Sequence, residues 1–134
     1  MELRLRYAEQ VVIIDILGKI TAGNGATTLH DQFLELLTAD RRQILLNLEQ
    51  TTYADSFGLA EIVACYKRAR ERNGAIGLLC PPGRVRDLLR VTRLDEVLEI
   101  FTKEDEALAA IDRRSRENGI HGGVLLPRPV PFMI

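Results

Sequence analysis

Residues 51–60 read Thr51-Thr52-Tyr53-Ala54-Asp55-Ser56-Phe57-Gly58-Leu59-Ala60 and stand between two different periodicities. Before them, residues 44–48 form an apolar run of strand length, Ile-Leu-Leu-Asn-Leu. After them, apolar residues recur at helical spacing: Leu59, Ile62, Val63 and Tyr66. The pattern predicts a buried strand, then a polar turn, then a helix whose N-terminus receives Asp55 and Ser56.

The N-terminus of a helix has unpaired backbone N–H groups and a partial positive charge. Asp55 or Ser56 can therefore act simply as the helix cap. A hydroxyl at Ser56 could instead accept a phosphoryl group, which adds about −1.5 to −2 charges beside the Asp55 carboxylate. Gly58 suits both interpretations, because glycine allows another stretch of backbone to approach closely.

Leu46-Asn47-Leu48, a short gap and then residues 53–59 resemble the signature of the STAS domain. In that family a hydrophobic strand precedes Asp-Ser-(Ser/Thr)-Gly-Leu-Gly, which opens a helix. The resemblance implies that Ser56 is the residue phosphorylated by a partner kinase and that Asp55 is its acidic neighbour. Phe57 departs from the usual Ser or Thr and makes the partner surface more apolar. Ala60 stands where the second Gly is usual.

The resemblance covers residues 1–112, because the segments 11–20, 74–79 and 85–94 also match the family's element order. It implies an α/β fold, a STAS-like mixed sheet of about five strands, one antiparallel at an edge, with about four helices. The remaining residues, 113–134, are expected to form a C-terminal tail with several Pro and Gly residues. This tail is unusually apolar for a disordered segment, so it could instead dock on its own domain, on a dimer mate or on a partner protein.

Local patterns place the other elements. Alternating residues 3–7 and the β-branched run 11–17 predict an antiparallel hairpin. Helices are expected at residues 25–39, 57–72, from 85 and from 102, and further strands at 76–79 and 97–101. The Gly-rich loop 18–25 has two open interpretations: it borders the phosphorylation site and contacts the kinase, with Gly23 and Asn24 exposed to it, or it only connects the sheet to the next helix. His30 lies off the apolar stripe of its helix and is expected to be solvated.

Composition excludes several classes of function. The chain has 134 residues, a net charge of −1, 46% hydrophobic and 28% charged residues, so nothing drives it toward nucleic acid or an anionic membrane. Two isolated cysteines and the lack of a signal peptide or membrane span predict a cytoplasmic protein. No phosphate-binding loop, nucleophile elbow or zinc-ligand set is present, so no cofactor and no metal are expected. A binding module is favoured over an enzyme.

The resemblance implies an anti-sigma factor antagonist. Its partner would be an anti-sigma factor with a serine-kinase ATPase fold, which phosphorylates Ser56 and so regulates sigma-factor-dependent transcription. The expected partner-binding residues are Asp55, Ser56, Phe57, Gly58, Ala60, Gly23 and Asn24. A homodimer is left open. Two alternatives remain: a scaffold subunit of a larger assembly, such as a stressosome-like or lipid-transport complex, and a nucleotide-binding module.

Overall fold

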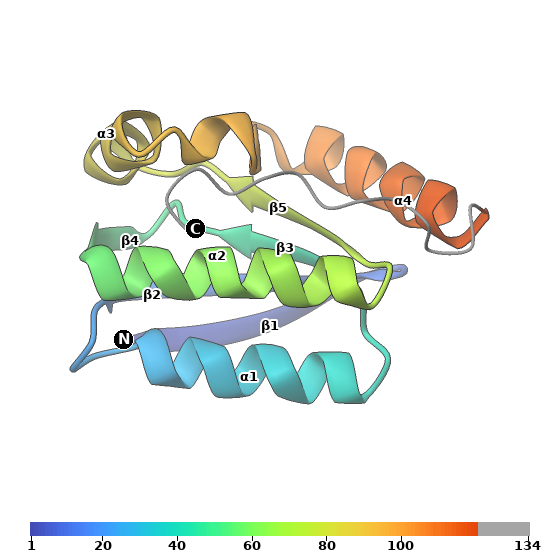
Figure 1. Cartoon of the computed structure of the whole chain (residues 1–134), viewed down its shortest axis with the longest axis horizontal. Helices are drawn as coiled ribbons and strands as arrows, with labels where there is room; N and C mark the ends of the chain where they lie inside the picture. The colour runs from blue at the N-terminus through green and yellow to red at the C-terminus, as the bar shows by residue number, and fades with distance from the viewer. Residues whose placement is uncertain (121–134) are drawn as a thin grey trace.

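The computed structural model describes residues 1–120, with residues 115–120 as backbone alone. Its described part is a mixed sheet of six strands with four α-helices, which confirms the expected α/β class (Figure 1). The elements in chain order are β1 (Glu2–Ala8), β2 (Val11–Ile20), α1 (Ala26–Thr38), β3 (Gln43–Asn47), β4 (Thr51–Ala54), α2 (Ser56–Glu71), β5 (Ala75–Leu79), α3 (Gly83–Val91), the 3-10 helix η1 (Leu94–Glu96), β6 (Glu99–Phe101) and α4 (Glu104–Ile120).

The strand order is β1-β2-β3-β5-β6, with β4 paired to β2 off this path. The predicted hairpin is confirmed: β1 pairs antiparallel with β2, from Glu2 opposite Leu17 to Ala8 opposite Val11. The other pairings are parallel. Among the strands of residues 1–120, β1 alone is antiparallel, and it lies at the edge of the sheet, as the sequence predicted.

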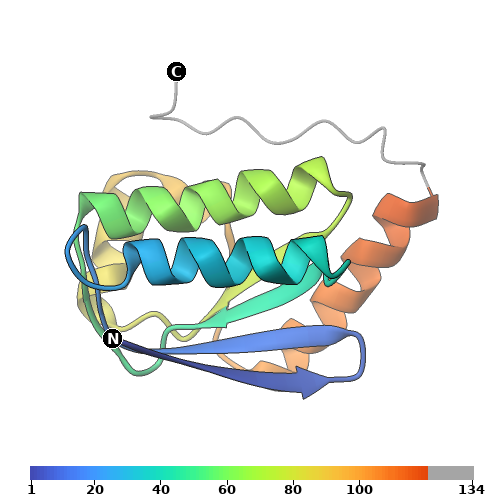
Figure 2. The same cartoon turned by 90° about the horizontal axis from the view of Figure 1, so that it is seen from below.

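Both faces of the sheet are covered (Figures 1 and 2). α1 and α2 lie side by side over one face, with α3 beside them, and α4 crosses the other. Successive residues of β2 serve opposite faces: Val12 and Ile14 belong to the core beneath α1 and α2, whereas Val11 and Ile13 pack with Ala107 of α4. This double burial explains why β2 and β3 are nearly continuous apolar runs.

The expected polar turn before α2 is wrong in one respect, because residues 51–54 form the strand β4. At Gly18 (φ 96°) the register of β2 shifts, and β2 exchanges its partner β3 for β4. The Thr51 side chain is buried and its hydroxyl donates to the Ile16 carbonyl at 2.8 Å. A threonine that appears polar in the sequence is thus bound inside the sheet, and the sheet has six strands instead of five.

The last described helix begins near residue 102, as expected. α4 continues to Ile120, beyond the boundary placed after residue 112. Arg114 of this helix forms an ion pair with Glu99 at 3.0 Å, which links the helix to β6. The expectations about docking of the apolar, Pro-rich tail concern residues 121–134 and lie outside the described residues.

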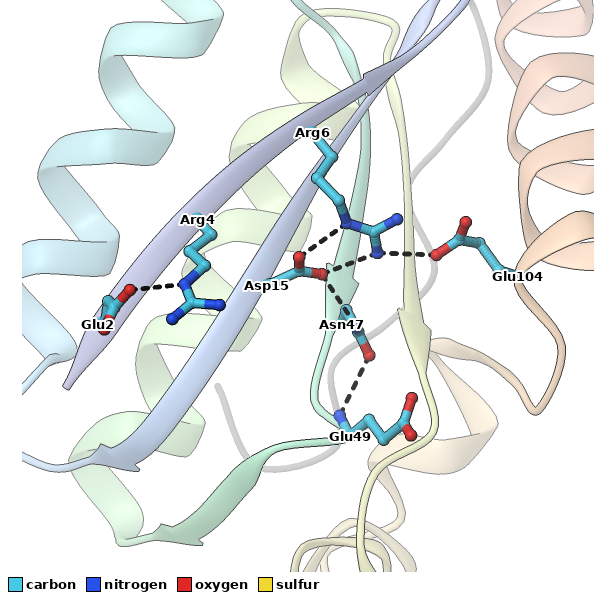
Figure 3. Close-up of polar contacts among 7 residues, drawn as sticks. All are labelled: Glu2, Arg4, Arg6, Asp15, Asn47, Glu49 and Glu104. Carbon is cyan, nitrogen blue, oxygen red and sulfur yellow. Dashed lines mark hydrogen bonds and ion pairs between the residues drawn. The ribbon is translucent and has the colours of Figure 1, made fainter.

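Asp15 interrupts the apolar run of β2 and is held in a polar network (Figure 3). Two nitrogens of Arg6 donate to its carboxylate at 2.7 and 2.8 Å, and Asn47 donates at 2.8 Å. Arg6 also donates to Glu104 at 2.7 Å, so the network joins β1, β2, β3 and α4. The hydrogen bonds from Arg6 are the main cause that lowers the pKa of Asp15 below its ordinary value.

Replacement of Asp15 by Asn (Asp15→Asn) should lower the free energy of unfolding at pH 7 by about 1–2 kcal/mol, because it removes a charged acceptor from Arg6. The folded pKa of Asp15 is depressed, so its contribution is present above the unfolded pKa of about 4 and is lost as pH falls through the folded pKa. Urea unfolding of wild type and Asp15→Asn at several pH values measures this contribution to the free energy of unfolding. The difference between wild type and variant should narrow below pH 4.

The exposed Glu2–Arg4 pair offers a matched control. Glu2→Gln should leave the stability unchanged within the error of the measurement, since exposed ion pairs contribute little. Equal stability of Asp15→Asn and wild type at pH 7, or a difference that does not change on acidification, would contradict this account of the network.

Gly58 sets how closely α2 approaches the sheet. It is buried, and a Cβ atom at this position would overlap the carbonyl oxygen of Ile20. The first turn of α2 therefore rests directly on the backbone of β2, and the sequence-based interpretation of Gly58 as a site of close approach is confirmed.

Replacement of Gly58 by Ala (Gly58→Ala) should destabilise the fold by about 1–3 kcal/mol, because overpacking against backbone cannot be relieved by a rotamer change. This loss would occur although Ala has the better helix propensity. Gly23→Ala is the control, since no atom lies within 4 Å of a Cβ there. Thermal and urea unfolding of both variants measure the effect, and a Gly58→Ala protein as stable as Gly23→Ala would refute the close-packing argument.

Candidate functional site

The site lies where β4 passes into α2. Asp55 has extended backbone (φ −94°, ψ −174°) and is the N-cap of α2. Its Oδ1 atom accepts a hydrogen bond from the Gly58 backbone N–H at 2.9 Å. Of the two capping residues that the sequence left open, the structure therefore selects Asp55.

Ser56 is the first residue of α2 and is exposed to solvent. Its hydroxyl has no hydrogen-bond partner within the described part of the chain. Because Asp55 caps the helix, the Ser56 oxygen is not needed for capping. A negative group added to this oxygen would be stabilised by the positive end of the helix dipole.

The loop between β2 and α1 borders this helix start. The Ala22 backbone N–H donates to Asp55 Oδ2 at 3.4 Å. Thr21 and Asn24 close the loop with two backbone hydrogen bonds of 2.7 and 3.1 Å. Gly23 and Asn24 are both exposed, and the Asn24 side chain accepts a hydrogen bond from the Met1 amino group at 3.0 Å. The two segments that sequence analysis assigned to one partner surface are therefore adjacent.

Exposed aromatic side chains accompany Ser56. Phe57 is 64% exposed and Tyr53 is 43% exposed. Phe57 and the half-buried Ala60 line a shallow groove of about 400 Å³ between the starts of α1 and α2. The exposed part of the predicted surface thus comprises Ser56, Phe57, Gly23 and Asn24, while Gly58 lies beneath it.

Sequence analysis missed three contributors. Tyr53 was taken as part of a turn, although it belongs to the strand β4, where it is exposed like Thr52 and precedes the buried Ala54. Arg84 of α3 lines a second groove, of about 430 Å³, next to Ser56. His30 was expected to be solvated, but its Nδ1 lies 2.9 Å from Glu61 Oε1, beside Arg68 at 3.6 Å from the same oxygen. No local signal could have revealed the last two, because their neighbours are distant in the sequence.

Comparisons with known proteins agree with this geometry. The family model of the STAS domain matches residues 2–107. A Thermotoga neapolitana protein, provisionally named an anti-sigma factor antagonist, is 30% identical over 109 residues, covering 81% of this chain and 96% of the relative. No helix in the described part of this chain has the length and apolar character needed to cross a membrane.

Solved structures show the same architecture. The crystal structure of the Thermotoga maritima protein TM1081, also provisionally named an anti-sigma factor antagonist, has a TM-score of 0.78 at 27% identity and covers 83% of this chain and 95% of its own. Bacillus SpoIIAA in its phosphorylated form has a TM-score of 0.65 at 19% identity, with coverage of 84% and 98%. SpoIIAA supports the fold alone. By its sequence match, its element order and its motif at the start of α2, the chain belongs to the STAS domain family.

Proposed function

We propose that this chain is an anti-sigma factor antagonist of the cytoplasm that is controlled by phosphorylation of Ser56. The observation on which the proposal depends is the exposed Ser56 hydroxyl at the first position of α2, which has no partner among the described residues because Asp55 caps the helix. The names of the Thermotoga relatives support the general class. The partner would be an anti-sigma factor with a serine-kinase ATPase fold.

In the proposed reaction the kinase supplies the catalytic groups and this chain is the substrate. The Ser56 oxygen attacks the γ-phosphorus of ATP, the bond from that phosphorus to the bridging oxygen breaks, and ADP leaves. The hydroxyl proton passes to a base of the kinase. The product is a phosphoserine with about −1.5 to −2 charges at neutral pH.

The surface around Ser56 suggests how this charge would change binding. Unmodified, the surface presents Phe57 and Tyr53, which are aromatic anchors of the kind that dominate protein interfaces. A phosphoryl group placed among them would have to lose its hydration on binding, and it would stand near the Asp55 carboxylate. A penalty of about 1.4 kcal/mol already weakens an affinity tenfold. Phosphorylation would therefore release the anti-sigma factor, which could then bind its sigma factor.

The exposed Phe57 also favours a second candidate function, a scaffold subunit of a larger assembly. Phe57 replaces the second hydroxyl residue of the family motif and leaves a 64% exposed aromatic ring at the site. Gel filtration of the purified chain separates the two functions. A monomer or dimer fits the antagonist, and a large particle fits the scaffold.

Intact-mass analysis of the protein from its native cells tests the switch directly. We expect a fraction of the molecules to gain the mass of one phosphate, mapped to Ser56 by peptide analysis. Replacement of Ser56 by Ala should abolish the gain, whereas Thr52→Ala, at an exposed hydroxyl on β4, should preserve it. An unmodified Ser56 under growth, stress and stationary conditions would reject the proposed switch.

Replacement of Phe57 by Ala should weaken binding of the anti-sigma factor at least about tenfold, since exposed aromatic anchors are frequent hot spots. The stability of the variant should be within about 0.5 kcal/mol of wild type, because the ring is mostly in water. Tyr7→Ala is the matched control: its ring is 59% exposed, at the far end of the β1–β2 hairpin. Calorimetric titration measures the affinities. Equal losses for both variants would mean that the binding surface lies elsewhere.

A further inference from the structure

The groove on the α3 side of Ser56 contains one cationic side chain. Ser56, Tyr53, Arg84 and Leu88 are among its lining residues, and its volume is about 430 Å³. We propose that Arg84 binds the phosphoryl group of phosphorylated Ser56 within this groove. The inference rests on the proposed function, since it names the residue of this chain that receives the new charge.

The topology places Ser56 and Arg84 at the end of the sheet where the parallel strands have their carboxyl termini. β4 and β5 both run parallel to β2 and β3, so the helices that follow β4 and β5 begin at this same end. α2 begins at Ser56 and α3 begins at Gly83, with Arg84 as the second residue of α3. The buried Val85 and Leu89 anchor α3 in the core, so the position of Arg84 at this end of the sheet is fixed.

Arg84 is the cation available at this groove. It is exposed and has no ion pair within the described residues. Two other arginines of this region are already paired: Arg90 with Asp87 at 2.9 Å and Arg93 with Glu96 at 3.4 Å. Arg86, although exposed, does not line the groove. The one carboxylate of the groove, that of Asp55, is used as the cap of α2 and accepts two backbone N–H groups.

The chemistry of the pair is complementary. A phosphoserine presents a dianion with three acceptor oxygens, and a guanidinium presents parallel N–H donors that match two of them. Unmodified, the groove offers a partner a free cation next to the apolar surfaces of Tyr53 and Leu88. Modified, this cation would be neutralised and the groove occupied. The modification would thus remove a docking feature for an acidic side chain in addition to adding charge beside Phe57.

The test uses the full chain with phosphoserine inserted at position 56 during translation, so no kinase is needed. Phosphorus NMR at low salt measures the second pKa of the phosphate in wild type, in Arg84→Gln and in the control Arg86→Gln. An opposite charge within about 4–6 Å lowers a pKa. We expect a phosphate pKa at least about 0.5 lower in wild type and Arg86→Gln than in Arg84→Gln, roughly a threefold change in the dissociation constant. The difference should shrink in salt.

Equal phosphate pKa values in wild type, Arg84→Gln and Arg86→Gln would overturn the role of Arg84. If Arg84→Gln does not fold, Arg84→Lys replaces it: the charge is kept but the paired N–H donors are lost, so the pKa should rise by less. Because the phosphate is inserted genetically, these results do not depend on the native kinase. If the NMR titration shows the ion pair but Ser56 carries no phosphate in native cells, the proposed function is rejected. If Ser56 is phosphorylated in native cells but the titration shows no ion pair, only the inference about Arg84 is rejected.

Discussion

The structure depends on the contact between the first turn of α2 and the end of β2. Gly58 lies against the Ile20 carbonyl with no room for a Cβ atom, and the Asp55 N–H donates to the same carbonyl at 3.3 Å. The carboxylate of Asp55 also accepts a hydrogen bond from the backbone N–H of Ala22, in the loop that follows β2. Strand end, loop and helix start are therefore fixed as one unit, and the side chains between these contacts face the solvent in defined positions.

This contact requires β2 to extend beyond its partner β3. β3 pairs with β2 only as far as Asp15, whereas β2 continues to Ile20. The positive φ of Gly18 and the buried hydroxyl of Thr51 allow β4 to take over the pairing. The position of Ser56 depends on β4, a short strand that pairs with β2 across a register shift between Gly18 and Lys19. β4 was also the hardest strand to predict from the sequence, because threonine is usually exposed and is buried only when its hydroxyl is hydrogen-bonded.

What the sequence could predict follows from the same physics. Periodicity identified the β1–β2 hairpin, α1, α2 and β5, since each has many residues that repeat one burial pattern. A cap at Asp55 or Ser56 and the close approach at Gly58 followed from local rules, but only the structure selects Asp55 as the cap. Contacts between residues far apart in the chain could not be predicted: the pair His30–Glu61, the network around Asp15, and the approach of Arg84 to Ser56 arise from topology. The boundary after residue 112 was placed where the composition becomes polar, and α4 continues through this change to Ile120.

The order Asp55-Ser56-Phe57 gives one helix turn three separate tasks. Successive residues of a helix point in directions about 100° apart. Ser56, the first helical residue, therefore lines the groove beside α3, and Phe57, the second, lines the groove beside α1, whereas Asp55 precedes the helix with extended backbone and caps it. Were Ser56 the cap, its hydroxyl would be engaged with the backbone and a phosphoryl group would disrupt the helix start. With Asp55 in that role, charge can be added at Ser56 without loss of any hydrogen bond that holds the fold. The proposed switch would therefore change the surface between the two grooves without changing the core.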